Sequence, residues 1–149
     1  MINRERIPRE LLKQLESRLE GKVQDIVFPP PVFDALQGEI IDYDLEEKMV
    51  QTRFPILAAH LNPYGNMQGG IISAAIDNTI GPLSMLVSPP NFTRYMKVKY
   101  GKVVSPDLGF IYVTAHHTGG KKRFLYFEAV VRDSDGNILA SAESTHWVI

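Results

Sequence analysis

Two features of one stretch of the chain point to chemistry. A glycine pair, Gly69-Gly70, opens an apolar run, and Asp77 places a carboxylate inside that run. Glycines are poor helix formers, so a pair at the start of a helix suggests that a ligand approaches the backbone there, where free N–H groups and the positive end of the helix dipole point outward. A carboxylate on an apolar helix, without a basic partner nearby in the sequence, is a candidate catalytic group. Each feature also has a structural interpretation: close packing for the glycines and exposure to solvent for Asp77.

A loop and a helix must position these residues. Asn62-Pro63 favours the start of a turn, and Gly65 tolerates backbone angles that other residues resist. Apolar residues then recur at helical spacing over 71–86, which predicts a buried helix of about three to four turns. Gly81-Pro82 is expected to weaken the end of this helix, or to kink it if the helix continues.

The order of Asn62, Gly65, Gln68-Gly69-Gly70 and Asp77 resembles the hotdog-fold acyl-CoA thioesterases. It is most similar to the branch that contains the phenylacetate-pathway and 4-hydroxybenzoyl-CoA thioesterases. That branch typically reads Asn-x-x-Gly-x-x-His-Gly-Gly, followed by an Asp or Glu on the long helix. The resemblance extends in outline from about residue 38 to the C-terminus. It has one departure, because Gln68 stands where His is usual.

The resemblance implies a role for each residue of the motif. Thioester hydrolysis needs an electrophilic pull on the carbonyl oxygen and an attack on the carbonyl carbon. The N–H groups of Gly69 and Gly70 would supply the pull, and Asp77 would act either as nucleophile or as general base on water. Asn62 matches the position beside the reacting carbonyl or water. Gln68 keeps hydrogen-bonding capacity but cannot change charge near neutral pH, so it replaces an orienting His but not a titrating one.

Coenzyme A carries several phosphates, so basic side chains are candidates for binding it. Lys121, Lys122 and Arg123 follow a glycine pair at a strand turn and are the preferred phosphate contacts, with Arg94 a further candidate. For any one of them an ordinary solvated surface is the simpler interpretation. Coenzyme A would be part of the substrate, so no separate cofactor is expected. No metal site is expected either.

The remaining pattern predicts an α+β fold. A helix is expected over 8–20, a proline-rich strap pinned by Phe28 and Phe33 over 28–33, and a strand or hairpin over 38–54. Four β-like runs cover 93–104, 109–118, 123–133 and 138–148. A mainly antiparallel sheet would curl around the long central helix, as in the hotdog fold that the resemblance implies. The expected division is an N-terminal helix and strap over 1–37 and a hotdog domain over 38–149, in a single domain overall.

Composition narrows the classes of function. A chain of 149 residues is long enough for one domain with a core, and its net charge of −1 argues against a general nucleic-acid binder. The absence of cysteine excludes a disulfide scaffold and a cysteine nucleophile. No apolar run is expected to reach the length of a membrane span, and the N-terminal residues are charged, so a cytoplasmic protein without a membrane partner is expected.

Helix geometry predicts that the site is shared between two chains. The eight steps from Gly69 to Asp77 span about 12 Å, which an aspartate side chain cannot cover. Two antiparallel helices from different subunits would remove the difficulty, and the resemblance implies such a homodimer, with a homotetramer common.

Two other functions stay open at this stage. The first is a hotdog protein that binds acyl-CoA without turnover, as a sensor or regulatory module. The second is a hotdog enzyme that hydrates enoyl thioesters, a branch that uses an Asp–His pair, although no histidine lies near Asp77 in the sequence. The acyl group is not identified, and the aromatic residues Phe92, Tyr95 and Tyr100 are expected around it.

Overall fold

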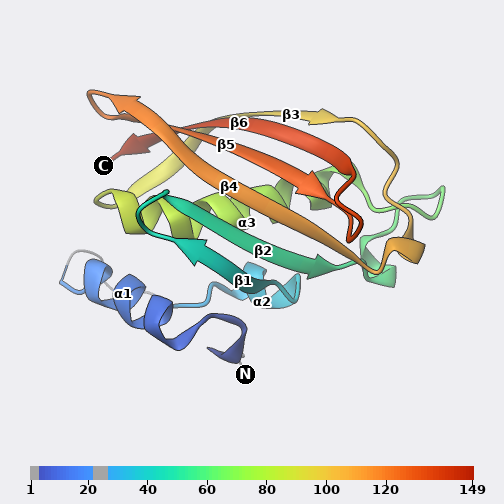
Figure 1. Ribbon diagram of the computed structural model, residues 1–149, viewed down its shortest axis with the longest axis horizontal. Helices are drawn as coiled ribbons and strands as arrows, with labels where there is room; N and C mark the ends of the chain where they lie inside the picture. Colours follow the sequence, from blue (N-terminus) through green and yellow to red (C-terminus); the bar gives the residue numbers. More distant parts are fainter. Residues whose placement is uncertain (1–3, 22–26) are drawn as a thin grey trace.

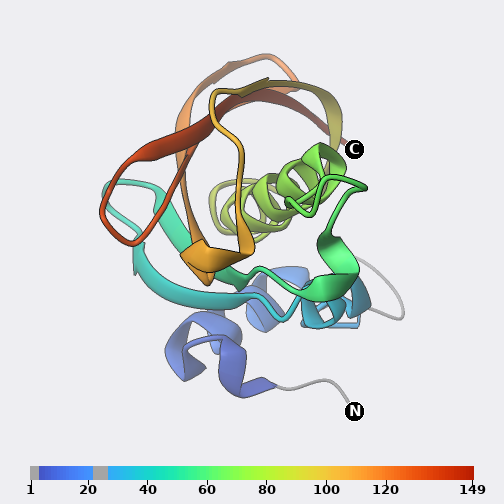
Figure 2. The same cartoon turned by 90° about the vertical axis from the view of Figure 1, so that its right-hand side faces the viewer.

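One curved sheet wraps around one long helix. The computed structural model describes residues 4–21 and 27–149. Within this part of the chain, six antiparallel strands follow the order β1-β2-β4-β5-β6-β3, and helix α3 (Gly69–Val87) lies along the concave side of the sheet (Figures 1 and 2). The strands are β1 (Glu39–Asp44), β2 (Met49–Pro55), β3 (Asn91–Tyr100), β4 (Phe110–Lys121), β5 (Phe124–Arg132) and β6 (Ile138–Val148).

The alternation of side chains along the strands decides which face of the sheet meets α3. On β5, Phe127, Ala129 and Val131 are buried, whereas the neighbouring Tyr126 and Glu128 are exposed. This alternation separates two faces of the sheet, as expected from the period of two along a strand. The inner face packs against the buried side of α3 and forms one core with it. The predicted α+β architecture, a mainly antiparallel sheet around a central helix, is confirmed.

Helix α3 is longer than its sequence pattern predicts. Its 19 residues make about five turns, and it continues through Pro82. A proline inside a helix removes one backbone hydrogen bond, which usually favours a break. Here Pro82 and Leu83 are both buried, and the Ser84 hydroxyl donates to the Gly81 carbonyl at 2.7 Å. Burial of the last turns therefore outweighs the lost bond.

The expectation that no apolar run reaches the length of a membrane span is wrong for α3. By length and composition alone, this helix is long and apolar enough to cross a membrane. However, 50% of its most apolar window is buried inside the fold, as in a core helix that a sheet encloses.

The N-terminal region packs on the same core. Helix α1 (Arg9–Leu19) follows the predicted range closely, and Leu11 and Leu15 are fully buried. The proline-rich segment is not extended throughout, because Pro31 begins a short helix, α2 (Pro31–Ala35); proline is pre-organised for the first helical position. Phe33 is buried and Phe28 half-buried, so both contact the core as predicted. Residues 1–3 and 22–26 of the predicted region 1–37 lie outside the described residues. The 3-10 helices are Arg4–Arg6, Ala58–His60 and Pro106–Leu108.

Candidate active site

The loop before α3 is closed by its own polar groups. The Asn62 carboxamide oxygen accepts the N–H groups of Tyr64 at 2.9 Å and of Asn66 at 3.2 Å, and the Asn62 N–H donates to the Asn66 carbonyl at 2.7 Å. Gly65 has φ +80°, a left-handed angle that favours glycine at this turn. Asn62 therefore holds the loop in shape in addition to any role beside a substrate.

The start of α3 is fixed by two backbone hydrogen bonds from different segments. Met67 N–H donates to the Val104 carbonyl at 2.8 Å, and Gln68 N–H donates to the His60 carbonyl at 2.9 Å. Helix geometry leaves the N–H groups of Gly69 and Gly70 without a carbonyl one turn earlier in the helix. They are the donors that this end of α3 can present to a ligand.

The two glycines differ in their surroundings. A Cβ at Gly69 would lie 3.3 Å from the Tyr100 ring, so glycine at this position serves close packing. A Cβ at Gly70 would meet nothing within 4 Å. The structural interpretation of the glycine pair thus accounts for Gly69, and Gly70 is the position that borders open space.

A cavity of about 550 Å³ lies beside this end of the helix. Asn62, Gly69 and Tyr100 contribute to its wall, and the Tyr100 hydroxyl is hydrogen-bonded to the Ser73 hydroxyl. Asp77 does not line this cavity. Within one chain the structure therefore brings part of the predicted motif together but leaves the carboxylate elsewhere.

Asp77 is half-buried and held by a side chain of β3. The Thr93 hydroxyl donates to Asp77 Oδ1 at 2.7 Å, and the Thr93 oxygen lies 3.3 Å from His146 Nε2. His146 Nδ1 lies 2.8 Å from Asn91 Oδ1. Burial lowers the pKa of His146, and the Asp77 charge opposes this in part. Thr93, His146 and Asn91 carry no local signal in the sequence, because only the pairing of β3 with β6 places Thr93 opposite His146.

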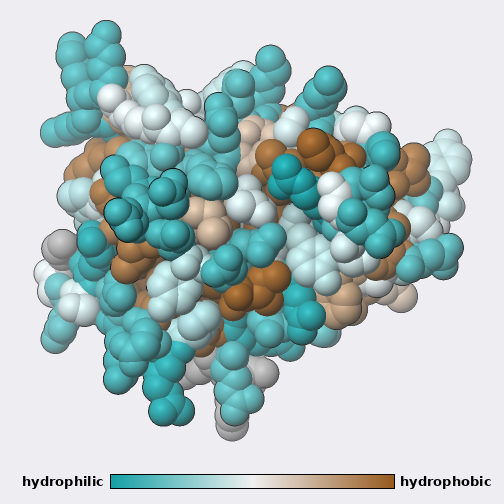
Figure 3. Space-filling model, in the orientation of Figure 1, coloured by the Kyte–Doolittle hydropathy of each residue, from teal (hydrophilic) through white to brown (hydrophobic). Residues whose placement is uncertain are grey.

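The predicted phosphate contacts gather around one indole ring. The guanidinium carbons of Arg94 and Arg123 lie 5.1 Å and 5.9 Å from the centroid of the Trp147 ring, and the Phe124 ring meets the same indole edge-on at 4.8 Å. The other two predicted contacts, Lys121 and Lys122, are exposed at the adjacent β4–β5 turn. Hydrophilic side chains project from this corner of the molecule in Figure 3.

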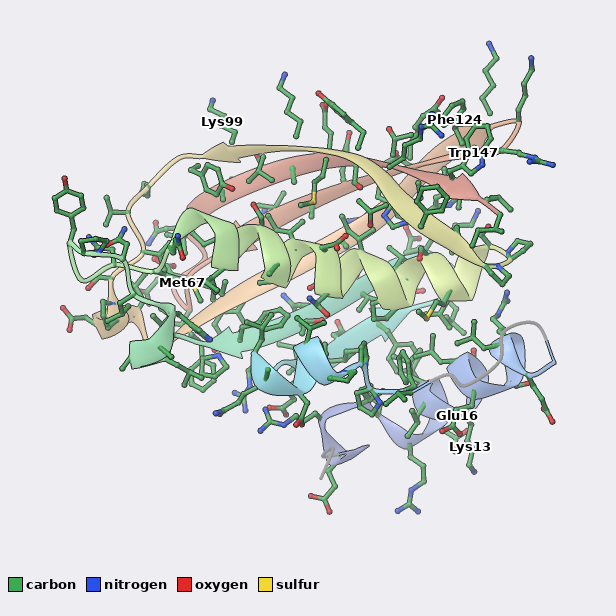
Figure 4. The ribbon with its side chains drawn as sticks, turned by 180° about the vertical axis from the view of Figure 1, so that it is seen from behind. Lys13, Glu16, Met67, Lys99, Phe124 and Trp147 are labelled. Carbon is green, nitrogen blue, oxygen red and sulfur yellow. The ribbon has the colours of Figure 1, made fainter. Side chains whose placement is uncertain are left out.

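These four basic residues form a cationic corner of the molecule, and this corner is far from the start of α3. In Figure 4 Trp147 and Phe124 lie toward one end of the helix, and Met67 lies at the other. Asp77, through its bond to Thr93, is tied to the strand segment that runs beside Trp147. The basic residues thus lie toward one end of α3 and the glycine N–H groups at the other, while Asp77 lies near the middle of the helix.

Comparison with known proteins identifies the fold. No family model and no curated protein matches the chain. Among solved structures, the E. coli PaaI protein of the phenylacetic acid degradation operon is similar with a TM-score of 0.77 and 13% identity, over 94% of each chain. A putative thioesterase related to phenylacetic acid degradation from Ralstonia eutropha JMP134 gives a TM-score of 0.75 and 22% identity, over 91% of this chain and 99% of that one.

A third similar structure carries a ligand. A hypothetical thioesterase from Streptococcus pneumoniae, solved with coenzyme A, gives a TM-score of 0.69 and 17% identity, over 75% of this chain and 85% of that one. These neighbours are thioesterase-superfamily structures, several of them PaaI-like. The chain shares their hotdog fold, as its sequence resemblance implied.

Proposed function

We propose that the protein is an acyl-CoA thioesterase that hydrolyses its substrate to a free acid and coenzyme A. The observation that carries the proposal is Asp77, a carboxylate on the apolar core helix that a hydrogen bond from Thr93 orients. The similar structures support the reaction class, since several are named thioesterases and one was solved with coenzyme A.

The proposed chemistry uses two parts of α3, the glycine N–H groups at its start and Asp77 near its middle. The N–H of Gly70, with that of Gly69, polarises the thioester carbonyl, and the dipole of α3 adds to this pull. Asp77 attacks the carbonyl carbon directly or activates the attacking water. Gln68 and Asn62 flank the carbonyl and orient it by hydrogen bonds, without a change of charge.

The separation of Gly69 and Asp77 within one chain supports a site that two chains share. Reacting atoms must lie about 3–3.5 Å apart, whereas about 12 Å of helix separates Gly69 from Asp77. Strand β3 is at an edge of the described sheet, and it exposes Phe92 and Tyr95 with 47% and 60% of their surfaces accessible. We propose that a two-fold partner packs along this edge. Asp77 and the cationic corner of one subunit would then meet the glycine N–H groups of the other. Tetramers would be pairs of such dimers.

The primary test measures thiol release from a panel of short-chain, medium-chain and aryl acyl-CoAs. We expect release by the wild-type protein and none by Asp77→Asn, which keeps the shape of the side chain but removes the carboxylate. Substrate binding and thermal stability should be retained. Asp107→Asn, a change at an exposed aspartate outside α3, is the matched control and should not alter turnover. Saturable binding without release by the wild type would instead support a non-catalytic acyl-CoA-binding protein.

A further inference from the structure

Four polar side chains form a continuous chain that leads from Asp77 into the core. They come from three elements: Asp77 from α3, Asn91 and Thr93 from the start of β3, and His146 from β6. The successive contacts are 2.7 Å from Thr93 Oγ1 to Asp77 Oδ1, 3.3 Å from Thr93 Oγ1 to His146 Nε2, and 2.8 Å from His146 Nδ1 to Asn91 Oδ1. Asp77 is half-buried, but only 2% of His146 is accessible, so His146 cannot touch a substrate.

The hydrogen-bond partners of Asn91 assign the proton on the histidine ring. Asn91 Nδ2 donates to the carbonyls of Pro89 at 3.0 Å and Ser84 at 3.3 Å. The oxygen of the same carboxamide therefore faces His146, and a carboxamide oxygen only accepts hydrogen bonds. His146 must carry its proton on Nδ1. In the neutral ring, Nε2 is then an unprotonated acceptor.

The single hydroxyl proton of Thr93 has two possible acceptors. The shorter contact assigns it to Asp77 Oδ1, because 2.7 Å is the usual length of a hydroxyl–carboxylate bond and 3.3 Å is long for a hydroxyl–imidazole bond. In this state the lone pair of His146 Nε2 faces an oxygen whose proton points elsewhere. The contact between Thr93 Oγ1 and His146 Nε2 therefore has no proton, and it is the one contact of the chain that is not a hydrogen bond.

We propose that Thr93 and His146 form a proton relay for Asp77, which rests on the general-base form of the proposed thioester hydrolysis. When Asp77 takes a proton from the attacking water, the new carboxylic O–H donates it to Thr93 Oγ1 as the Thr93 hydroxyl proton moves to His146 Nε2. One proton crosses, no electrons are exchanged, and Asp77 returns to a carboxylate. The reverse movement returns the proton for the departing thiolate.

The surroundings of His146 suit a temporary proton acceptor. In the protonated ring both nitrogens donate, Nδ1 to Asn91 and Nε2 to Thr93, so every contact of the chain becomes a hydrogen bond. The Phe127 ring lies against His146 at 4.8 Å between centroids, and the burial lowers the pKa of the ring. Among the described residues, Asp77 is the charged group that acts on His146 and raises its pKa. His146 is therefore neutral at rest, and the nearby Asp77 carboxylate stabilises the second proton that the ring takes up during the relay.

Matched variants separate the relay from a structural role. His146→Asn keeps a donor near the position of Nδ1, and leaves the Thr93–Asp77 bond intact, but it removes the Nε2 acceptor. We expect kcat to fall by about 10²-fold with KM unchanged. Thr93→Val should lower kcat at least as far, Thr93→Ser should restore it, and adding His146→Asn to Thr93→Val should cause no further loss, since the two residues act as a unit.

His117 provides the control. It also lies against the Phe127 ring, at 5.1 Å between centroids, but it contacts neither Thr93 nor Asp77 in the described network. His117→Asn should leave kcat unchanged. Full kcat in His146→Asn, with Asp77→Asn inactive, would overturn the relay and leave the proposed hydrolysis standing. Absence of thiol release by the wild-type protein would overturn both.

A measurement on the wild-type protein is independent of any variant. Nitrogen-15 NMR distinguishes the two neutral tautomers of histidine. We expect His146 to carry its proton on Nδ1 at neutral pH. A proton on Nε2 instead would remove the acceptor from the relay and contradict the proposal.

Discussion

Mixing two inactive variants should restore activity if each site is built from two chains. The first variant is Asp77→Asn, which loses the carboxylate and keeps the helix start. The second is Gly70→Pro, which removes a backbone N–H and keeps the carboxylate. Proline is tolerated in the first turn of a helix, and a Cβ at Gly70 meets nothing within 4 Å, whereas at Gly69 it would meet the Tyr100 ring. Gly70 is therefore the better position at which to block the N–H groups without disturbing the fold.

The expected recovery follows from the symmetry of the dimer. In a heterodimer one site joins the intact Asp77 with the intact Gly70, and the other site joins both substituted residues. Random exchange at equal concentrations makes about half of the dimers heterodimers, so about a quarter of all sites should work. Thiol release by the mixture should approach about a quarter of the wild-type rate per chain.

The controls decide what a negative result means. Each variant alone must be folded and inactive, and mass spectrometry of differently tagged chains must show that heterodimers form. Activity no higher than background in proven heterodimers would refute the shared site. A single chain would then have to bend or move to bring Gly69 and Asp77 together. Full activity of Gly70→Pro alone would instead remove the Gly70 N–H from the mechanism.

Three further changes test other parts of the structure. Gln68→His should preserve or raise kcat/KM, because histidine is usual at this position in the family that the motif resembles; a large loss in a folded variant would show a site adapted to glutamine. The free energy of unfolding should fall as the pH drops below about 6.5, because burial and Lys48 lower the pKa of His117 in the folded protein. In that range the unfolded chain binds a proton at His117 that the folded chain does not bind. Urea titrations should therefore show a weaker pH dependence of stability in His117→Asn. Leu15→Ala should lower the free energy of unfolding by about 2–5 kcal/mol, since Leu15 is fully buried against the core, and an unchanged urea midpoint would contradict the packing of α1.

The sequence by itself determined the local elements and the motif. Hydrophobic periodicity predicted α1, α3 and the strands after α3, because the spacing of apolar residues depends only on the repeat of the local backbone. It predicted β6 at its observed bounds, 138–148. Local signals failed where burial competed with them: Pro82 suggests a helix end, but the buried last turns keep α3 helical, and Pro31 starts a short helix inside an expected extended strap.

Only the tertiary structure decided which residues surround Asp77. Thr93 meets His146 because β3 pairs with β6 in one register, and a shift of β3 by one residue would turn Thr93 to the other face. The same pairing places Arg94 over Trp147, next to Arg123 from a different turn. No local pattern encodes such contacts, because they depend on the order of strands in the sheet. The proposed meeting of Asp77 with Gly70 would depend on a further level, the packing of one chain against another.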